Sequence, residues 1–317
     1  MTSKATFIDL FAGIGGMRLG FEKAGAECLL TCEISESALE TYKANYNPKH
    51  EHRYVGDILS LNSKDVPKHD VLIAGFPCQP YSIAGLRKGL EDERGGDIFL
   101  AILRILRDVK PQAFLLENVK GMMSHDKGET FKFIIKSLSD CGYSIDHKVL
   151  NTMTHANVPQ NRERVFVVGF RDEKKLQAFS YPKEVDLKKT IHDCLENGKV
   201  SDEFYYTERY DCYKELKRVM KNRDTIYQWR RQYVRENKSN ACPTLTANMG
   251  SGGHNVPLVL DDFGIRKLTP REVANFQGFP KTFKLPKLAN SKLYHQFGNS
   301  VSVPLIEKLA KGIISVL

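Results

Sequence analysis

The chain has 317 residues, of which 41% are hydrophobic and 27% charged, and its formal net charge is +9. No apolar run approaches the roughly 20 residues that span a bilayer, and the N-terminus lacks the features of a secretion signal. These properties exclude a membrane protein and favour a protein that stays inside the cell. The length suggests one large domain and a smaller one. The charge favours a polyanionic partner, although a solvated basic surface explains it equally well.

The first half of the chain alternates short apolar runs with amphipathic stretches. The runs that predict strands are residues 6–11, 71–76, 113–116 and 164–170. Helices are predicted where apolar residues recur at helical spacing, as in Met17, Phe21 and Ala24; Ile98, Ile102, Ile105 and Val109; and Phe131, Ile134, Ile135 and Leu138. Such alternation predicts an α/β fold with a mostly parallel sheet that is covered by helices on both faces.

The second half changes character. From about residue 185 to 263 the sequence is polar, aromatic and basic, which predicts a smaller, irregular domain. A last helix opened by Ser302 and Pro304 is predicted to return to the large domain. We therefore expect a large domain formed by residues 1–184 and 293–317, and a small domain formed by residues 185–292.

A glycine-rich turn follows the first strand. Residues 7–16 read as a strand that enters a turn containing Gly13, Gly15 and Gly16, an arrangement that lets a ligand approach the backbone closely. Arg18 occupies the place of the third glycine in the dinucleotide motif GxGxxG, so NAD is a poor candidate. Glu33 ends the next apolar segment, where a carboxylate can accept hydrogen bonds from ribose hydroxyls. Asp57 is a candidate partner for an adenine amino group.

The seven cysteines contain no CxxC pair, which argues against a disulfide framework and against the usual zinc spacing. Cys78 differs from the others because it follows the predicted strand 71–76, at the carboxyl edge of the sheet, where such folds bind ligands. An isolated intracellular cysteine is more often a small buried apolar residue. Residues 79–97 combine four glycines with Arg87, Lys88 and Arg94, which suggests a cationic lid over an anionic substrate.

Five segments in this order closely resemble the bacterial DNA cytosine-5 methyltransferases of the restriction-modification type: residues 11–16 (FAGIGG), 77–79 (PCQ), 117–119 (ENV), 160–164 (QNRER) and 296–301 (QFGNSV). They span nearly the whole chain. The resemblance implies a Rossmann-like S-adenosylmethionine-dependent domain with a mostly parallel sheet, and a smaller irregular target-recognition domain. It also implies transfer of a methyl group to C5 of a cytosine in a specific double-stranded DNA sequence.

The resemblance assigns the catalytic residues. Cys78 is expected to add to C6 of a cytosine rotated out of the helix, Glu117 to hold ring nitrogen N3, and Arg164 to contact the cytosine carbonyl oxygen. Arg162, two residues away on the same side of an extended strand, is predicted to share this site. Without the other motifs, residues 117–119 would read as a strand-end turn, and the arginines as partners of surface carboxylates.

The cofactor contacts that the resemblance implies are Phe11, Gly13, Gly15, Gly16, Glu33, Ile34, Asp57, Ile58, Phe76, Asn299 and Ser300. Ile34 departs from the pattern, since many relatives carry a larger aromatic there to cover adenine, although isoleucine still provides an apolar wall. The expected product is S-adenosylhomocysteine, and no metal is expected.

DNA contacts are predicted in both halves. Segment 221–238 interleaves six Lys and Arg residues with Tyr227, Trp229 and Tyr233, and residues 243–254 resemble the recognition-loop region of the family. The predicted contacts are Gln79, Ser82, Arg94, Arg230, Arg231, Thr244, Gly252 and Gly253. We expect a monomer in the bacterial cytoplasm, associated with the nucleoid, and a restriction endonuclease that acts on the same site.

Three alternatives are open. An RNA cytosine-5 methyltransferase would use the same thiolate chemistry, although the glycine-rich loop 250–254 favours duplex DNA. A non-catalytic nucleic-acid-binding module would be expected to lose Cys78 or Glu117, and both are present. A dehydrogenase is weaker still, because Arg18 breaks the motif that it requires.

Overall fold

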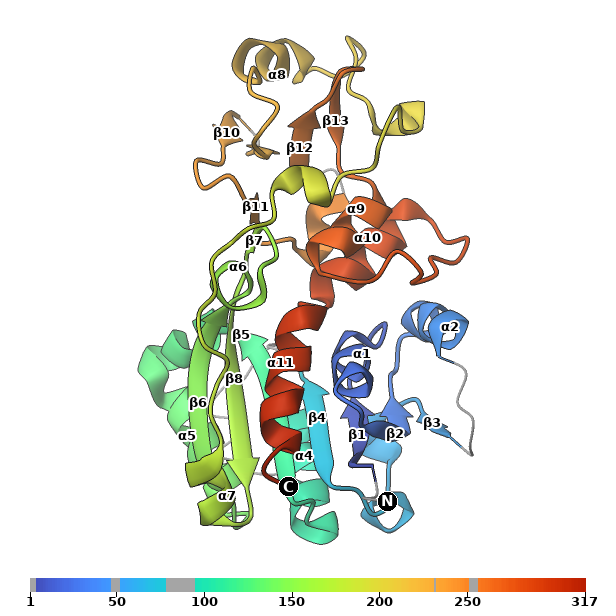
Figure 1. The fold of residues 1–317 in the computed structure, drawn as a ribbon. Coiled ribbons are helices and arrows are strands. Elements are labelled where there is room, and N and C mark those ends of the chain that lie inside the picture. Colours follow the sequence, from blue (N-terminus) through green and yellow to red (C-terminus); the bar gives the residue numbers. More distant parts are fainter. Residues whose placement is uncertain (1–3, 47–51, 78–94, 231, 251–255) are drawn as a thin grey trace.

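The computed structural model describes residues 4–46, 52–77, 95–230, 232–250 and 256–317. These residues form a seven-stranded sheet, a four-stranded sheet and a short two-stranded link between them (Figure 1). The strands of the large sheet, in order across it, are β3 (Arg53–Val55), β2 (Glu27–Cys32), β1 (Thr6–Leu10), β4 (Val71–Gly75), β5 (Ala113–Val119), β8 (Glu163–Phe170) and β6 (Ser144–Asn151).

Neighbouring strands from β3 to β5 run parallel, and β8 runs antiparallel to both β5 and β6. The predicted α/β class with a mostly parallel sheet is therefore confirmed. Strand β6 was not predicted, because only Leu150 of its eight residues is buried and no apolar run marks it.

Helices cover both faces of this sheet, because successive strand residues point to opposite sides. Phe7 of β1 packs in one core cluster with α1 (Gly16–Lys23) and α11 (Val303–Ile314). Its neighbour Ile8 packs in another cluster with α4 (Gly95–Val109) and α5 (Glu129–Ser139). The last helix therefore returns to the large sheet, as predicted from residues 302–314.

The second sheet is antiparallel, in the order β10-β9-β12-β13. Its strands are β9 (Tyr227–Trp229), β10 (Val234–Glu236), β12 (Val256–Leu260) and β13 (Ile265–Lys267). Helix α8 (Tyr213–Val219) covers one face, where its Leu216 joins a small core with Tyr227 and Leu258. In the two-stranded link, β7 (Gln160–Asn161) pairs with β11 (Cys242–Pro243). The remaining α-helices are α2 (Glu36–Asn45), α6 (Thr152–Ala156), α7 (Glu173–Ala178), α9 (Pro270–Phe276) and α10 (Asn290–Asn299).

A third core cluster joins the two parts. It buries Ile14 of the glycine-rich turn and Tyr42 of α2 together with Leu245, Phe276 and Phe297 from the C-terminal half. Figure 1 shows α9 and α10 between the two sheets. Because this core draws on both halves of the chain, the predicted domain limits at 185 and 293 stay a prediction.

The segment before α9 is structural. Thr269 caps the helix by accepting a hydrogen bond from the backbone N–H of Glu272, and Pro270 stands in the first turn. The fully buried carboxylate of Glu272 accepts hydrogen bonds from both terminal nitrogens of Arg266, each at 2.8 Å. The pair holds β13 against the start of α9, and it is satisfied on both sides, as a buried ion pair requires.

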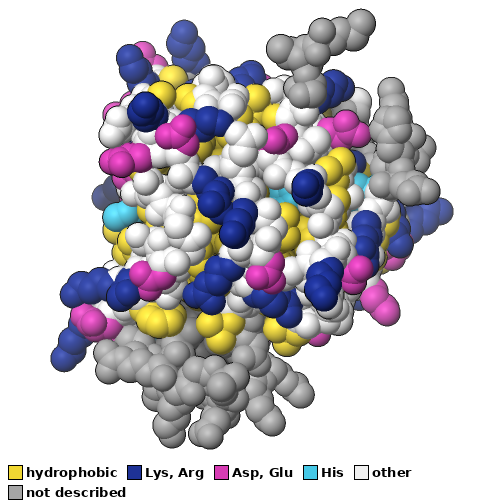
Figure 2. All heavy atoms as spheres, turned by 90° about the horizontal axis from the view of Figure 1, so that it is seen from below, with side chains coloured by type: hydrophobic (Ala, Val, Ile, Leu, Met, Phe, Trp, Pro, Cys, Tyr) yellow, Lys and Arg dark blue, Asp and Glu magenta, His cyan; other side chains and the backbone are white. Residues whose placement is uncertain are grey.

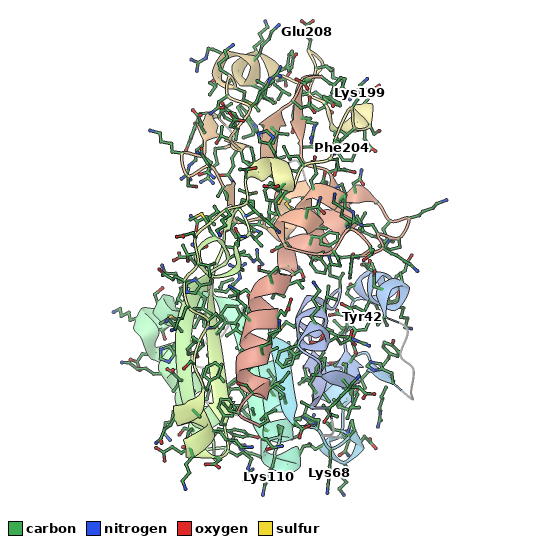
Figure 3. The ribbon with its side chains drawn as sticks, in the orientation of Figure 1. Tyr42, Lys68, Lys110, Lys199, Phe204 and Glu208 are labelled. Carbon is green, nitrogen blue, oxygen red and sulfur yellow. The ribbon has the colours of Figure 1, made fainter. Side chains whose placement is uncertain are left out.

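Charged groups are spread over the molecule. Viewed along the sheet from the end where Lys68 and Lys110 lie, Lys and Arg side chains are interspersed with acidic ones (Figures 2 and 3). Within the described part of the chain, no helix is long and apolar enough to cross a membrane.

Asp9 of β1 is a buried carboxyl group, and its effect on the free energy of unfolding depends on pH. Its side chain is 0% exposed, and neither oxygen has a hydrogen-bond partner among the described residues. Burial raises the pKa of Asp9 to about 8, and the nearby Arg18 charge offsets this only in part. Between about pH 4 and pH 8 the unfolded chain is ionised at this position while the folded chain keeps its proton. Raising the pH through this window therefore lowers the free energy of unfolding.

We expect Asp9→Asn to remove this dependence. The wild-type chain should lose on the order of 3 kcal/mol more than the variant between pH 5 and pH 8. Denaturant unfolding at the two pH values measures the difference, with Asp108→Asn on the exposed side of α4 as the control. Equal losses for wild type and Asp9→Asn would show that Asp9 is not protonated in the folded chain.

Candidate active site

The glycine-rich turn leaves β1 in a conformation that ordinary residues avoid. Phe11 has φ +58°, Gly13 has φ +56° and Gly15, the N-cap of α1, has φ +82°. A bulky residue with positive φ is a strained exception that its surroundings must hold, and such residues cluster at functional sites. Apart from its chain neighbours, a Cβ at Gly13 would meet no atom of the described residues within 4 Å. Its glycine is therefore needed for the turn, and the space beside it is open to a ligand.

Arg18 fills the region beneath this turn. It is almost completely buried, donates hydrogen bonds to the Tyr42 hydroxyl at 2.9 Å and to Glu22 at 2.6 Å, and stacks on the ring of Tyr46. The Tyr46 hydroxyl in turn donates to the carbonyl oxygen of Gly15 at 2.6 Å. Figure 3 places Tyr42, a residue of α2, beside α1. The position that a dinucleotide motif keeps as glycine is thus filled by a side chain that supports the turn.

Glu33 closes the turn from the end of β2. One carboxylate oxygen accepts from the backbone N–H of Gly13 and the other from that of Ser35, both at 2.7 Å. The next side chain, Ile34, is 73% exposed, which is unusual for an isoleucine. Asp57, after β3, is exposed and caps the short 3₁₀ helix Ile58–Ser60 by accepting from the N–H of Leu59. These residues line the carboxyl edge of β1, β2 and β3.

The far end of the chain meets the same turn. Asn299 is the last residue of α10, and Ser300 follows it. A side chain at Gly16 would come within 2.6 Å of the Ser300 hydroxyl oxygen, so the two segments are in close contact. Phe76, after β4, is buried with its ring 5.9 Å from that of Phe99. The structure thus brings Asn299 and Ser300 against the glycine-rich turn and places Phe76 at the end of the adjacent strand.

The predicted catalytic carboxylate lies at the same edge of the sheet. Glu117 stands opposite Gly75 in the β4–β5 register and is only 8% exposed. Its carboxylate forms a 3.0 Å ion pair with Nε of Arg164 on the antiparallel strand β8. The amide of Asn118, next in the chain, donates to the carbonyl oxygen of Phe76 at 2.9 Å. The segment that leads into Cys78 is therefore tied to the residue beside Glu117.

Cys78 itself lies outside the described residues, as do Gln79, Ser82 and Arg94 of the predicted lid and Arg231, Gly252 and Gly253 of the predicted recognition segments. Six other cysteines are described, and all have free thiols. Burial raises the pKa of Cys28 and of Cys32 to about 12 in each case. These two thiols are therefore poor nucleophiles at neutral pH.

The guanidinium of Arg162 makes different contacts from that of Arg164. It is 2% exposed, and its guanidinium donates to the carbonyl oxygens of Leu245 at 2.8 Å, Gly298 at 3.2 Å and Ser300. Burial, together with the neighbouring Arg164 charge, lowers the pKa of Arg162 to about 9. Since these contacts occupy both terminal nitrogens, we propose a positioning role in place of the predicted catalytic one.

A joint of buried hydrogen bonds surrounds Arg162. Gln160, which is 0% exposed, accepts from the N–H of Leu245 at 3.2 Å and donates to the carbonyl oxygen of Phe276 at 2.6 Å. A side chain at Gly298 would come within 2.3 Å of the Thr246 backbone, so glycine is required there. The joint thus connects residues 160–162, the Thr244–Leu245 segment and the end of α10.

We expect Arg162→Lys to lower the free energy of unfolding by about 2–3 kcal/mol, because one ammonium cannot satisfy three separated carbonyls. Its kcat/KM should fall with it. Arg164→Lys is the matched control and should keep stability within about 1 kcal/mol while lowering kcat. Denaturant unfolding and steady-state methylation of both variants make the comparison. A fully stable Arg162→Lys protein with a large loss of kcat would instead place Arg162 at the target base.

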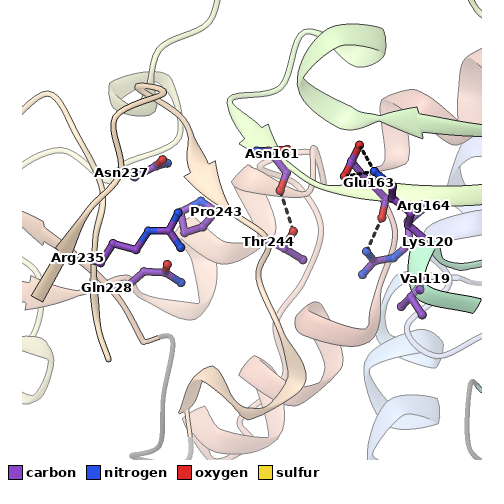
Figure 4. Close-up of a pocket in the computed structure, with 11 residues that line it drawn as sticks. Val119, Lys120, Asn161, Glu163, Arg164, Gln228, Arg235, Asn237, Pro243 and Thr244 are labelled. Atoms are coloured by element: carbon purple, nitrogen blue, oxygen red, sulfur yellow. Dashed lines mark hydrogen bonds and ion pairs between the residues drawn. The ribbon is translucent and has the colours of Figure 1, made fainter. Parts of the chain in front are cut away.

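A cleft of about 420 Å³ lies between the two sheets (Figure 4). One wall comes from the ends of β5 and β8, with Val119, Lys120, Glu163 and Arg164. The other comes from the hairpin of β9 and β10 and the residue after it, with Gln228, Arg235 and Asn237. Between them, the Thr244 hydroxyl donates to the carbonyl oxygen of Asn161 at 2.7 Å. Thr244, which is a predicted DNA contact, therefore lies in the cleft. Arg230 lies at the β9–β10 turn, where its N–H donates to the carbonyl oxygen of Tyr233.

Comparison with known proteins shows the family to which this chain belongs. A family model described as C-5 cytosine-specific DNA methylase matches residues 5–315. The chain belongs to the C-5 cytosine-specific DNA methylases. Among relatives of this DNA methylase, the Type II methyltransferase M.Bsp6I of Bacillus sp. (strain RFL6) is 51% identical over 308 residues, covering 96% of this chain and 97% of the relative. M.HpaII of Haemophilus parainfluenzae is 38% identical, covering 100% and 91% respectively.

A solved structure agrees with the fold of this DNA methylase. The Dnmt2 methyltransferase of S. pombe matches with a TM-score of 0.74 and covers 98% of this chain and 99% of its own. The identity is 21%, so this likeness bears on the fold alone. The family and the fold class predicted from the five motifs are thereby confirmed.

Proposed function

We propose that this DNA methylase transfers a methyl group from S-adenosylmethionine to C5 of a cytosine in a specific double-stranded DNA sequence, with Cys78 as the attacking thiolate. The observation that carries the assignment of roles is the Glu117–Arg164 ion pair, 3.0 Å long. It stands at the end of β5, beside the strand β4 that leads into Pro77 and Cys78. A base placed there would lie between a thiolate and a hydrogen-bonding acid.

The residues at the adjacent edge fit S-adenosylmethionine. A Cβ at Gly13 would meet no neighbouring atom of the described residues within 4 Å, the Glu33 carboxylate accepts from the Gly13 N–H, and the exposed Ile34 offers an apolar wall. Glu33 would hold the ribose hydroxyls, Asp57 the adenine amino group, and Asn299 and Ser300 the end near α10. The bound cofactor supplies an activated methyl group on a sulfonium, with S-adenosylhomocysteine as the product and no metal required.

The chemistry of the base follows from three side chains. The Cys78 thiolate donates an electron pair to C6 and forms a C–S bond, which leaves C5 nucleophilic. Glu117 donates or shares a proton at N3, and Arg164 bonds the carbonyl oxygen, so both stabilise the charge on the ring. After methylation a base removes the C5 proton, and the C–S bond breaks to release the thiolate. A bound water can serve as that base.

The cleft fits a duplex from which one base has been rotated. A cytosine inside a helix cannot receive a thiolate on its face, so it must leave the stack. Basic side chains stand on both walls, Lys120 and Arg164 on one and Arg235 on the other, and Lys120 and Arg164 pair with Glu163 and Glu117. Such a cleft suits a polyanionic duplex. We propose that Thr244 and Arg230, with residues 79–94 and 251–254, complete the DNA contacts.

In the cell we propose a role in a restriction-modification system, where methylation protects host DNA from an endonuclease with the same recognition sequence. This role is supported by the names of the relatives, which are Type II methyltransferases. We further propose that the enzyme acts on DNA as a monomer in the bacterial cytoplasm, since one chain contributes both walls of the cleft.

The test incubates the protein with labelled S-adenosylmethionine and either duplex DNA or tRNA, followed by bisulfite mapping of the modified base. We expect label on duplex DNA, at one cytosine of one recurring sequence. Label on tRNA alone would favour an RNA cytosine-5 methyltransferase on the same scaffold. Label on adenine would remove Cys78 from the reaction.

A further inference from the structure

The wall of the cleft that faces the catalytic residues is a two-stranded ribbon. Strands β9 and β10 pair antiparallel, with Arg235 directly opposite Gln228. The hairpin lies at the edge of its sheet, because β10 has only one neighbour in the strand order. A two-stranded ribbon has the width of the DNA major groove, where base edges carry distinct hydrogen-bonding patterns.

The two faces of this ribbon have opposite characters. Tyr227 and Val234 point to the core beneath α8, since they belong to its buried cluster. Gln228 and Arg235, one residue along each strand, therefore project from the other face. Figure 4 shows both side chains extending toward the cleft near Pro243. The polar face of the ribbon thus lies across the cleft from Arg164 and from the proposed site of the target base.

Neither side chain has a partner that would explain its presence. Arg235 is exposed, and within the described part of the chain its guanidinium makes no hydrogen bond or ion pair. Gln228 is only 5% exposed, yet its amide has no hydrogen bond to any described residue. Asn237, on the same wall, differs because its amide donates to the carbonyl oxygen of Ala241. The Gln228 amide is not among the fully buried unpaired groups, so it and the exposed Arg235 guanidinium can both serve a hydrogen-bonding ligand at this wall.

We propose that Arg235 reads a guanine in the major groove close to the target cytosine, and that Gln228 is a positioning residue that orients its guanidinium. The planar fork of arginine matches the two acceptors, N7 and O6, that guanine alone presents there. Gln228 is enclosed and stands directly across the ribbon, so its amide oxygen can accept from Arg235 without entering the groove. The inference rests on the proposed methylation of duplex DNA, and it makes guanine an essential part of the recognition sequence.

A phosphate contact is the alternative role for Arg235, and methylation profiling separates the two. The full-length protein is given duplex DNA with random bases, and the methylated cytosines and their flanks are sequenced. Arg235→Ala should lower kcat/KM on the recognised sequence by about 5- to 150-fold and abolish the preference at one guanine. Arg235→Gln should move that preference toward adenine, which glutamine recognises through N6 and N7.

The variant Gln228→Ala should weaken the preference at the same guanine, which a purely structural role would leave unchanged. Arg218→Ala, an arginine of α8 paired with Glu215 on the opposite face of the small sheet, is the matched control and should alter nothing. An equal loss on all sequences, with a smaller salt dependence, would mean that Arg235 binds phosphate and would overturn the proposal. An unchanged profile for Arg235→Ala would overturn it too. Absence of any DNA methylation by the wild type would instead refute the proposed function.

Discussion

Cys78→Ala should abolish methyl transfer, with a fall in kcat of more than about 1000-fold, while S-adenosylmethionine binds nearly as before. C5 of cytosine becomes nucleophilic only when a thiolate has added at C6, and alanine has no electron pair to donate. The proposed cofactor contacts Glu33 and Gly13 follow strands β2 and β1, away from the segment of Cys78 in the sequence, and keep their hydrogen bond. Transfer of labelled methyl groups and titration of the cofactor measure the two properties separately.

A covalent adduct between the enzyme and a modified cytosine provides a second measurement for the same prediction. Duplex DNA containing 5-fluorocytosine cannot lose the substituent at C5, so the wild-type enzyme should remain bonded to it through the Cys78 sulfur. Cys78→Ala should form no such adduct. Cys212→Ala is the matched control, since Cys212 is the one described cysteine that is not buried. Turnover retained in Cys78→Ala, or an adduct lost in Cys212→Ala, would contradict the assigned nucleophile.

Glu117→Gln should lower kcat by about 100- to 1000-fold, with a smaller change in KM for DNA. The amide has nearly the same shape as the carboxyl group, but it cannot deliver a proton to N3 of the ring. It also lacks the charge that holds Nε of Arg164 at 3.0 Å. Single-turnover methylation at saturating DNA isolates this step from binding.

Glu163→Gln is the matched control for this second prediction. Glu163 lies on β8 beside Arg164, and its side chain pairs with Lys120 at the rim of the cleft. Exposed pairs of this kind contribute little, so the control should retain most of its single-turnover rate. Equal losses in the two variants would indicate a general effect of charge in the cleft and leave Glu117 without its special role.

The elements with strong apolar periodicity could be predicted from the sequence. Strands β1 and β4 and helices α4 and α11 lie where the apolar residues placed them, because burial on one or both faces requires such patterns. Strand β6 could not be found in this way, since it lies at the edge of the sheet with one buried residue. The third core, which joins Ile14 to Phe297, depends on contacts between distant segments that no local pattern records.

The candidate site divides in the same way. Glu117 and Arg164 were each assigned to the target base from the family motifs, and the structure brings them together in an ion pair that was not predicted. The predicted role of Arg162 rested on spacing along one extended strand, whereas β7 ends at Asn161 and β8 begins at Glu163, so Arg162 lies at a break between two sheets. The opposed positions of Gln228 and Arg235 follow from strand register, which the sequence does not specify without the turn geometry.

The joint around Arg162 bears on how such enzymes diversify. Its guanidinium donates hydrogen bonds to the backbone carbonyl oxygens of Leu245, Gly298 and Ser300. Every residue type has such a carbonyl oxygen. These hydrogen bonds do not themselves depend on side-chain identity, whereas the packing of Leu245 in the third core cluster and the close approach at Gly298 do. Side chains of the small sheet that face DNA can therefore be substituted in evolution while the hydrogen bonds that attach this sheet to residues 160–162 are kept. In this way one conserved type of large domain can be combined with recognition of many different DNA sequences.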